Sequence, residues 1–275
     1  MPEGPEIRIA ADNIAKIIEG QIIDDIDVGL PHLCKGARRL KGHKVERVET
    51  QGKAMLIHFA NQFSIYSHNQ LYGVWKTSQR GVLPDTTRSL RLALHTKASS
   101  ALLYSASDIG IYETHRLIEH PFLSKIGPDI LQPTLSWQTL SERLSSKRFR
   151  NRSLSSLYLD QHFIAGIGNY LRSEILFAAG LHPDLKPIQL SVRQIEDLAT
   201  QTLNVSKRAY ETKGYTVPDD LVEQLLVTDS DYENVRFMVF NRHQLPCRHC
   251  VHPITKAQRN GRRIYWCEHC QRPPR

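Results

Sequence analysis

Two Cys-x-x-Cys pairs close to the C-terminus constrain the fold of this chain more than any other feature. Cys247 and Cys250 form the first pair, Cys267 and Cys270 form the second, and sixteen residues separate them. Four thiolates at this spacing can surround one Zn²⁺ tetrahedrally, and a closed Cys₄ site is structural. The sequence therefore predicts a C-terminal zinc ribbon with these four cysteines as ligands. The fifth cysteine, Cys34, is left over and is most simply a packed or surface thiol.

Cysteine usage also indicates the compartment. Clustered cysteines favour a metal site in a reducing environment over a disulfide framework. The chain has no apolar run long enough to span a bilayer, and its acidic, polar N-terminus lacks a secretory signal pattern. We therefore expect a cytoplasmic protein with no membrane partner.

Positive charge is concentrated in the segment that holds the cysteines. From Arg236 to the end there are nine Lys or Arg and one acidic residue, Glu268. The first 235 residues carry 27 charges of each sign, so the net charge of +8 lies in this last segment. A basic pole on a neutral body indicates a polyanionic partner, most often nucleic acid. A solvated basic tail is the alternative, and the metal-ligand spacing in the same segment argues against it.

The first six residues, Met-Pro-Glu-Gly-Pro-Glu, hold a candidate nucleophile. Removal of the initiator methionine would leave a secondary amine on Pro2, and an α-amino group has a pKa of about 7.7 to 8.0. Such an amine can add to an aldehyde-like carbon and form an iminium ion, a good electron sink. Glu3 lies beside it as a proton donor or acceptor. An ordinary frayed terminus is the alternative on these residues alone.

The spacing of apolar residues predicts two kinds of structure along the chain. A helix should begin near Pro5 and end at Gly20. Short apolar or alternating runs then predict a largely antiparallel β-sandwich. These runs are residues 22–28, 45–48, 54–59, 63–66, 90–94 and 102–104.

A change of pattern at residues 126–134 predicts an interdomain linker, and the chain beyond it is helical in pattern. Ser136 can cap one helix, a second covers about residues 154–160, and a third follows Gly168. Ser191 and Gln194 form a capping-box pattern before a fourth. Residues 215–234 are acidic with few structural signals and predict a loop with at most one short helix. The predicted domains are 1–125, the linker 126–134, 135–234 and 235–275.

Three further motifs have modest weight. Residues 166–170, Gly-Ile-Gly-Asn-Tyr, could offer backbone N–H groups to a phosphate at a helix start, or could be a tight turn between helices. Lys53 follows Gly52 in a turn and could transfer protons near an acid and an amine, although most such lysines are solvated. Residues 67–73, Ser-His-Asn-Gln-Leu-Tyr-Gly, could fill a gap in a base stack or form a half-buried turn. Between the cysteine pairs, residues 259–263 have turn chemistry and precede a short strand.

The order of these motifs along one chain resembles the formamidopyrimidine-DNA glycosylase and endonuclease VIII family. The resemblance covers almost the whole chain and includes Gln51-Gly52-Lys53, Gly127-Pro128-Asp129 and the terminal ribbon. Within the family it is most similar to the bacterial endonuclease VIII branch, chiefly through residues 67–75 and 148–152. The resemblance implies an α+β multidomain fold: an N-terminal antiparallel β-sandwich, a helix–two-turn–helix domain and a C-terminal zinc finger.

The resemblance also implies an activity and a set of residues. Members are bifunctional DNA repair enzymes that flip out a damaged nucleotide, so the implied partner is damaged double-stranded DNA. Pro2 would attack C1′ and form the iminium, Glu3 would assist proton transfer at the sugar, and Lys53 would act as a general acid. Arg262, five residues before Cys267, occupies the position of the finger arginine for phosphate binding and δ-elimination, with Arg263 beside it as an alternative. The implied DNA contacts are Gln70, Leu71, Tyr72, Lys125 and Asn169.

The sequence leaves open which lesion is excised and whether the protein is catalytic. The endonuclease VIII resemblance implies oxidised pyrimidines such as thymine glycol, together with abasic sites. The long segment 215–234 keeps open a preference for 8-oxoguanine or formamidopyrimidine. A non-catalytic zinc-ribbon protein that only binds DNA is the alternative from another class. We expect a nucleoid-associated monomer with one structural Zn²⁺ and no small-molecule cofactor.

Overall fold

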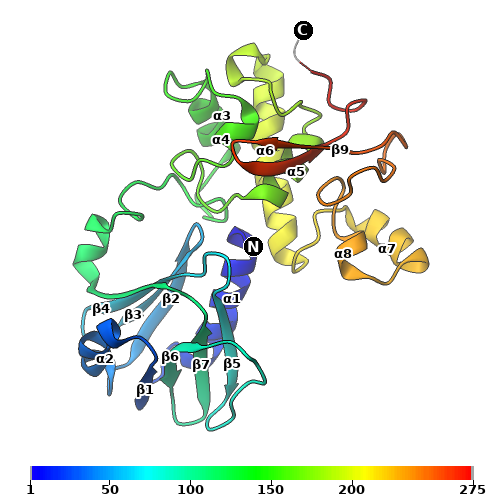
Figure 1. Cartoon of the computed structure of the whole chain (residues 1–275). Coiled ribbons are helices and arrows are strands. Elements are labelled where there is room, and N and C mark those ends of the chain that lie inside the picture. Colours follow the sequence, from blue (N-terminus) through cyan, green and yellow to red (C-terminus); the bar gives the residue numbers. More distant parts are fainter. Residues whose placement is uncertain (1, 274–275) are drawn as a thin grey trace. The chain divides into compact units, whose positions relative to one another are not determined.

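A computed structural model of the chain describes residues 2–273. The contacts divide the chain between Lys125 and Ile126 into two compact units. Figure 1 shows a β-rich first unit and a second unit built of helices and a C-terminal hairpin. The predicted fold class is therefore confirmed. No helix within residues 2–273 combines the length and the apolar character needed to cross a membrane.

The first unit is a sandwich of two four-stranded antiparallel sheets with one long helix packed against it (Figure 1). One sheet has the strand order β2-β3-β4-β8 and the other has the order β1-β6-β7-β5. Its elements are α1 (Gly4–Ile18), β1 (Asp25–Val28), η1 (Pro31–Leu33), α2 (Cys34–Leu40), β2 (Val45–Gln51), β3 (Ala54–Phe59), β4 (Phe63–His68), β5 (Val74–Gln79), β6 (Leu90–His95), β7 (Ser99–Tyr104), β8 (Asp108–Glu113) and η2 (Thr114–Glu119).

The core of the first unit explains why α1 is fixed. Apolar residues of α1 recur at helical spacing, so Ile7, Ile14 and Ile18 lie on one face. They are buried with Ile57 of one sheet and Leu103 of the other in a single cluster. Helix α1 therefore closes the sandwich, and its first turn is held in a defined place.

Within residues 126–273 the second unit has six α-helices and a two-stranded hairpin. Its elements are α3 (Trp137–Ser145), α4 (Leu154–Leu157), α5 (Asn169–Ala178), η3 (Pro187–Gln189), α6 (Val192–Glu211), α7 (Asp219–Thr228), α8 (Tyr232–Val235), β9 (Thr255–Arg259) and β10 (Arg262–Trp266). The predicted caps are confirmed: Ser136 accepts from the backbone N–H of Thr139, and Ser191 forms a capping box with Gln194. The predicted second helix is shorter than expected and ends at Leu157.

One sequence prediction in this unit is wrong. Residues 215–234 are not a loop, because they hold α7 and most of α8. Two aspartates in the first turn of α7 favour its start, since negative charge is stabilising at a helix N-terminus. Leu221, Val222 and Leu225 form an apolar stripe that packs on the ribbon core. This core is the buried cluster of Phe177, Val217, Met238, Val239, Cys247, Ile254, Tyr265 and Cys267. The sequence pattern also missed β5, β8 and α2 in the first unit.

The segment predicted as a linker is hydrogen-bonded to the second unit. The N–H of Ala165 donates to the carbonyl of Pro128 at 2.9 Å, and the N–H of Ile130 donates to the carbonyl of Ala165 at 3.0 Å. Ile130 is also part of the helical core, the large buried cluster of the second unit that includes Leu140, Leu171 and Leu198. Residues 127–130 are therefore an ordered part of this unit.

Candidate functional site

The first turn of α1 holds Pro2 and Glu3 in an ordered arrangement. Glu3 is the N-cap of α1 and is only 3% exposed, whereas Pro2 is half-buried. The backbone N–H of Glu3 donates to Oε2 of Glu6 at 2.9 Å, as one arm of a capping box. The amine nitrogen of Pro2 would thus lie at the positive end of a helix, beside two carboxylates. The helix dipole favours the free amine over its protonated form, whereas the two carboxylates favour the protonated form.

A cavity of about 350 Å³ begins at this end of α1. Glu6, Ile9 and Asn13 of α1 line one side, and Trp75 and Lys76 of β5 line the other. The indole N–H of Trp75 donates to Ser67 Oγ at 3.1 Å, which fixes the ring. The cavity therefore combines an apolar floor with charged and amide groups, and Glu6 of the α1 capping box is part of its lining.

Lys53 lies in a tight turn between β2 and β3. Gln51 and Ala54 are register partners, so the turn has two central residues, Gly52 and Lys53. Gly52 has a φ of +63°, which fits the first central position of a type II′ hairpin turn. The turn presents the half-buried Lys53 at the end of the sheet against which α1 packs.

His68, which belongs to the motif at residues 67–73, is a neighbour of Lys53. Burial lowers the pKa of His68; the carboxylate of Asp108 opposes this effect, and the charge of Lys53 adds to it. The ring of His68 lies edge-on to Phe122 at 5.5 Å between centroids, and its Nδ1 accepts from the N–H of Gln70 at 3.1 Å. A neutral imidazole therefore connects the lysine turn to the loop that follows β4.

That loop presents Gln70, Leu71 and Tyr72. The N–H of Gly73 donates to the carbonyl of Asn69 at 2.8 Å, which closes the loop. Leu71 is 56% exposed and Tyr72 is 69% exposed, although both are large and apolar. The hydroxyl of Ser107 holds the Gln70 side chain at 3.2 Å. Lys125, the last residue of this unit, is also exposed.

In the second unit, Asn169 is the first residue of α5. Gln161 organises the turn before it: its side chain accepts from the N–H of Gly166 at 3.0 Å and donates to the carbonyl of Ile167 at 2.9 Å. Asn169 is half-buried, and the helix positive end lies beside it. This arrangement suits an anion such as a phosphate.

The four cysteines form a compact cluster. Their sulfur atoms all lie within 4.8 Å of one another, with Cys250 and Cys267 at 3.4 Å and Cys247 and Cys270 at 3.9 Å. Tetrahedral Zn–S bonds of about 2.3 Å require sulfur atoms about 3.8 Å apart, so the donor set and its geometry fit Zn²⁺. The backbone N–H of His249 donates toward Cys247 Sγ at 3.5 Å. The four residues can therefore hold one metal ion.

Arg262 lies at the tip of the ribbon hairpin. Asn260 and Gly261 have φ values of +53° and +71°, so they form a type I′ turn between β9 and β10. Arg262 and Arg263 are both exposed but alternate in direction along β10. Ile264 and Trp266, on the face of Arg262, belong to the helical core, whereas Tyr265, on the face of Arg263, belongs to the ribbon core.

Two charged residues of α5 escaped the sequence analysis. Arg172 is fully buried, and its Nη2 donates to the carbonyl of Arg263 at 2.8 Å. Glu174 is 2% exposed and accepts from the backbone N–H groups of Met238, Val239 and Phe240, each at 2.8 Å. Charged residues inside an otherwise apolar helix were the available signal. Their contacts tie α5 to the ribbon.

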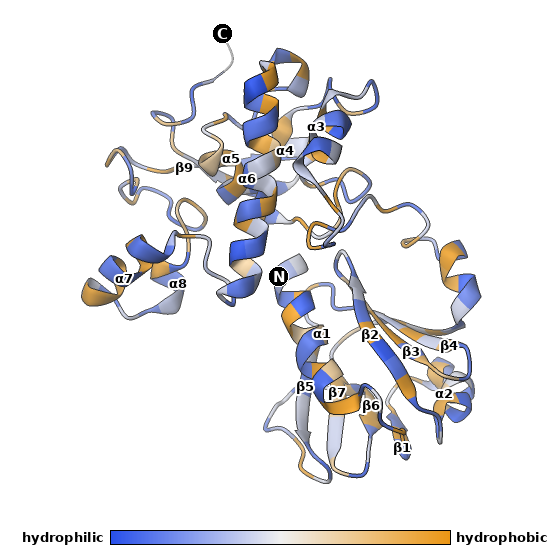
Figure 2. Ribbon diagram, turned by 180° about the vertical axis from the view of Figure 1, so that it is seen from behind, coloured by the Kyte–Doolittle hydropathy of each residue, from blue (hydrophilic) through white to orange (hydrophobic). Residues whose placement is uncertain are grey.

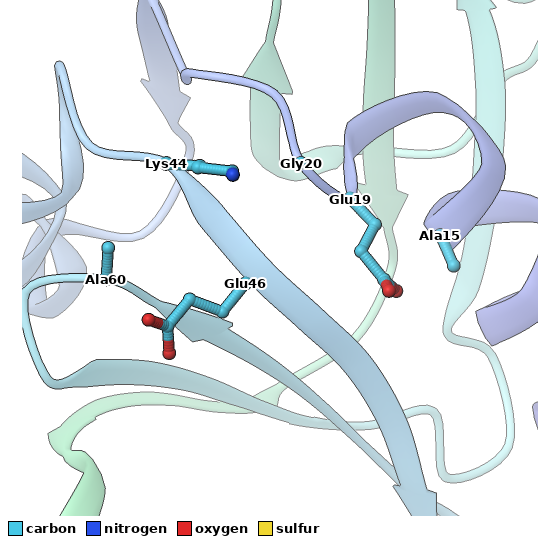
Figure 3. A pocket seen from close by; sticks show the side chains of 6 residues that line it. All are labelled: Ala15, Glu19, Gly20, Lys44, Glu46 and Ala60. Carbon is cyan, nitrogen blue, oxygen red and sulfur yellow. The ribbon is translucent and has the colours of Figure 1, made fainter.

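Another hollow, of about 590 Å³, lies at the opposite end of α1 (Figure 3). Glu19 and Glu46 place carboxylates in it, with the ammonium of Lys44 nearby, and Gly20, Ala15 and Ala60 complete the lining. Glu19 also accepts from the N–H of Val48 at 3.2 Å, which protects the edge strand β2. None of the predicted catalytic residues lines this hollow.

Known proteins resemble the chain along its whole length. The family model for the formamidopyrimidine-DNA glycosylase N-terminal domain matches residues 1–107, and that for the H2TH domain of the same glycosylase matches residues 126–220. Endonuclease 8 of Escherichia coli O6:K15:H31 is 45% identical over 273 residues, which cover 98% of this chain and 100% of that protein. Endonuclease 8 of Shigella sonnei is 44% identical with the same coverage.

Solved structures show the same fold. The Lactococcus lactis Fpg (MutM) in complex with DNA containing N7-benzyl-Fapy-dG matches with a TM-score of 0.81 at 20% identity, covering 99% of this chain and 100% of that one. The Lactococcus lactis Fpg bound to DNA with an abasic site has a TM-score of 0.81 and covers 98% of this chain and 100% of that one, also at 20% identity. The chain belongs to the formamidopyrimidine-DNA glycosylase family, whose members are DNA glycosylases and AP lyases.

Proposed function

We propose that this glycosylase and AP lyase of base excision repair excises oxidised pyrimidines of the thymine glycol type from duplex DNA. The full-length similarity to proteins named Endonuclease 8 supports this lesion class. One observation carries the mechanism: Pro2 directly precedes a buried N-cap carboxylate, Glu3, at the positive end of an ordered helix. The nucleophile is the Pro2 amine, freed by removal of Met1.

In the first step the Pro2 nitrogen attacks C1′ of the flipped nucleotide. The C1′–N bond to the base breaks, the base leaves with the electron pair and takes up a proton, and the sugar ring opens to give an iminium ion. Glu3 transfers the proton at the sugar during ring opening, and its burial keeps the carboxyl in place. Flipping costs a few kcal/mol of unstacking, which is least for a damaged base.

Two eliminations follow. The iminium withdraws electrons, so a proton leaves C2′ and the C3′–O bond to phosphate breaks. Loss of a further sugar proton then breaks the C5′–O bond in the δ-elimination. Lys53 is the general acid of these steps, and Arg262 binds the departing phosphate. Lys53 lies in a two-residue turn and Arg262 directly follows another, so the backbone of each residue has a defined position.

The remaining predicted residues bind DNA. Gln70, Leu71 and Tyr72 fill the space of the flipped nucleotide, and the exposed, largely apolar side chains of Leu71 and Tyr72 suit this role. Asn169 binds a phosphate together with the start of α5, and Lys125 contacts the backbone. The Cys₄ site holds one structural Zn²⁺, which stabilises the ribbon without taking part in the reaction. We propose that the protein acts as a monomer on the bacterial chromosome.

Borohydride trapping tests the nucleophile. Wild type is compared with a variant that carries extra residues before Pro2, so that the Pro2 nitrogen lies in a peptide bond. We expect a covalent adduct on a thymine glycol or abasic duplex with wild type only. Intact mass must first show that Met1 is absent from wild type. An adduct formed equally by the extended variant would contradict the assignment of Pro2.

The choice of lesion decides between two candidate substrates. The length of residues 215–234, which hold the helices α7 and α8, is the reason to test 8-oxoguanine and formamidopyrimidine as well. Initial excision rates on thymine glycol, 8-oxoguanine and formamidopyrimidine duplexes distinguish the two. A faster rate on either purine lesion would replace the pyrimidine assignment. Absence of any adduct despite tight binding and a free Pro2 would leave a DNA-binding protein that is not catalytic.

A further inference from the structure

The tip of the ribbon hairpin brings two arginines together. Arg259 ends β9, Arg262 begins β10, and they are register partners across the Asn260–Gly261 turn. Partners that close a two-residue hairpin project their side chains to the same face, with Cβ atoms about 5 Å apart. Like charges in this arrangement repel each other. The position of the Arg262 side chain therefore depends on what Arg259 does.

Arg259 is engaged by Asp184 in a two-pronged ion pair. Arg259 Nε lies 3.0 Å from Asp184 Oδ1, and Arg259 Nη2 lies 3.0 Å from Asp184 Oδ2. A guanidinium and a carboxylate joined by two parallel hydrogen bonds have a fixed mutual orientation. The Arg259 guanidinium also lies 5.9 Å from the Trp266 ring centroid. The ion pair therefore neutralises the charge of Arg259 and fixes the direction of its side chain.

Asp184 is itself held in place. It lies in the segment after α5, and its N–H donates to Nδ1 of the buried His182 at 3.2 Å. The His182 ring packs edge-on against Trp266 at 5.5 Å between centroids. The acid that binds one side of the hairpin is therefore anchored to a residue of the other strand. Arg259 is only about half-buried, so an ordering role is more consistent with the pair than a large contribution to global stability.

The second strand has its own attachment. Arg172 of α5 donates to the carbonyl of Arg263, and the N–H of Tyr265 donates to Ser173 Oγ at 3.3 Å. These bonds fix β10, and β9 is attached through its pairing with β10 and the packing of Ala257 against the helical core. The ion pair between Asp184 and Arg259 holds the end of β9 next to the turn.

We propose that Arg259 and Asp184 are positioning residues, whose ion pair fixes the hairpin tip and removes the positive charge beside Arg262, so that Arg262 stays extended toward the departing phosphate. This proposal rests on the role given to Arg262 under the proposed function. Neither Arg259 nor Asp184 touches the reacting atoms. The pair should therefore influence the δ-elimination and leave base excision unchanged.

The test uses the full-length, metal-loaded enzyme on a duplex with an abasic site. Asp184→Asn, Arg259→Gln and the double variant are compared in single turnovers that separate β-elimination from β,δ-elimination products. We expect each single variant to slow the second elimination about fivefold, with excision and the first elimination within about twofold of wild type. The double variant should be no slower than either single variant, because both remove the same interaction. The exchanged pair Asp184→Arg with Arg259→Asp should recover part of the rate.

Controls separate this proposal from the role of Arg262. Asp25→Asn breaks the Lys41–Asp25 ion pair, which is similarly exposed but lies in the first unit, and should change nothing. Arg262→Ala should abolish most δ-elimination. If Arg262→Ala does so while Asp184→Asn has no effect and Arg259→Gln slows the reaction, Arg259 contacts DNA itself and the positioning role is overturned.

Hydrogen exchange gives a readout that does not depend on Arg262. The backbone amides of β9 and β10 should exchange at least about fivefold faster in Asp184→Asn than in wild type, with unchanged exchange in α5. If Arg262→Ala still completes δ-elimination, the assignment of Arg262 is wrong and the positioning of the hairpin is judged from these amides. Unchanged amide exchange in the hairpin would overturn the proposal whatever Arg262 does.

Discussion

Helices α5 and α7 both have ten residues and both belong to the second unit, but they are built in opposite ways. In α5, residues 170–177 are all buried, including Arg172, Ser173 and Glu174. In α7 no residue is buried, and Val227 is 86% exposed. Figure 2 shows polar and apolar residues mixed along α7. The difference shows that what places a residue inside this unit is the availability of a partner and not its polarity.

The ribbon supplies those partners for α5. Glu174 binds three backbone N–H groups that lead into the ribbon and also accepts from the hydroxyl of Thr216. Arg172 and Ser173 bind β10. By contrast, the apolar contact of α7 with the ribbon core, among the residues that the structure describes, is made by its stripe of Leu221, Val222 and Leu225. Changes on the ribbon side should therefore disturb α5 more than α7.

The largest effect is expected from loss of the metal site. Cys247→Ser removes one of four ligands, and a Cys₄ segment with little core of its own depends on the metal for its folding free energy. We expect loss of bound zinc, faster hydrogen exchange in β10 and α5, and DNA affinity reduced more than about tenfold. Metal content and binding at fixed salt measure this. Cys34→Ser is the matched control, because Cys34 is exposed and lies outside the cluster; unchanged zinc content in Cys247→Ser would refute the ligand assignment.

The next effect concerns Glu174. Glu174→Ala leaves three backbone donors and the Thr216 hydroxyl without their acceptor in a buried place, and each unsatisfied group costs about 1–3 kcal/mol. We expect the free energy of unfolding of this unit to fall by at least about 3 kcal/mol, measured by denaturant titration. Glu223→Ala on the exposed surface of α7 is the matched control and should change it by less than about 0.5 kcal/mol. Similar losses in the two variants would remove the distinction between the helices.

These two predictions also show how far the sequence can lead. The cysteine spacing, the caps at Ser136 and Ser191, and the turn at Asn260 and Gly261 depend on residues close together in the chain, so they were predictable. Their chemistry is local.

The parts that escaped prediction depend on distant partners or on mixed patterns. The pairing of Asp184 with Arg259 joins residues 75 positions apart, and no local pattern indicates it. Strand β5 was missed because polar residues follow Trp75, and β8 because Gly110 interrupts it. Helix α7 was missed because its apolar stripe is narrow and its partner is the ribbon core. The roles assigned to Pro2, Lys53 and Asn169 came from family resemblance and stay predictions.

Glu49, a carboxylate of the first unit, is intermediate in exposure between the buried residues of α5 and the exposed residues of α7. Glu49 of β2 accepts from His58 Nε2 at 3.0 Å, while Nδ1 of the same ring contacts Ser64 Oγ at 2.8 Å. The hydrogen bond from His58 lowers the pKa of Glu49 to about 2, with burial opposing and Arg47 assisting. A carboxyl with a depressed pKa contributes stability that is complete above its ordinary value of 4.5 and is lost as the pH falls toward 2.

Acid should therefore weaken the sandwich through Glu49. After allowance for the partial exposure of this group, the contribution lost between pH 6 and pH 3 is about 1–2 kcal/mol. Urea unfolding of wild type and Glu49→Gln at several pH values measures it. The difference between the two proteins should shrink as the pH falls. A difference independent of pH would show that the hydrogen bond and not the charge matters.

The smallest effect is expected on the exposed side of α7. Val227→Ser replaces a side chain that is 86% exposed, so little apolar area returns to water and the free energy of unfolding should change by less than about 0.5 kcal/mol. Leu225→Ala, two residues earlier, removes part of the stripe on the ribbon core and should cost about 1–2 kcal/mol, less than a fully buried leucine because the site is half-buried. Hydrogen exchange across α7 distinguishes local from global loss: we expect faster exchange in α7 with α5 unchanged. Equal acceleration in α5 would mean that the two helices unfold together, and that α7, despite its exposure, is part of the same cooperative unit as the helix that carries Asn169.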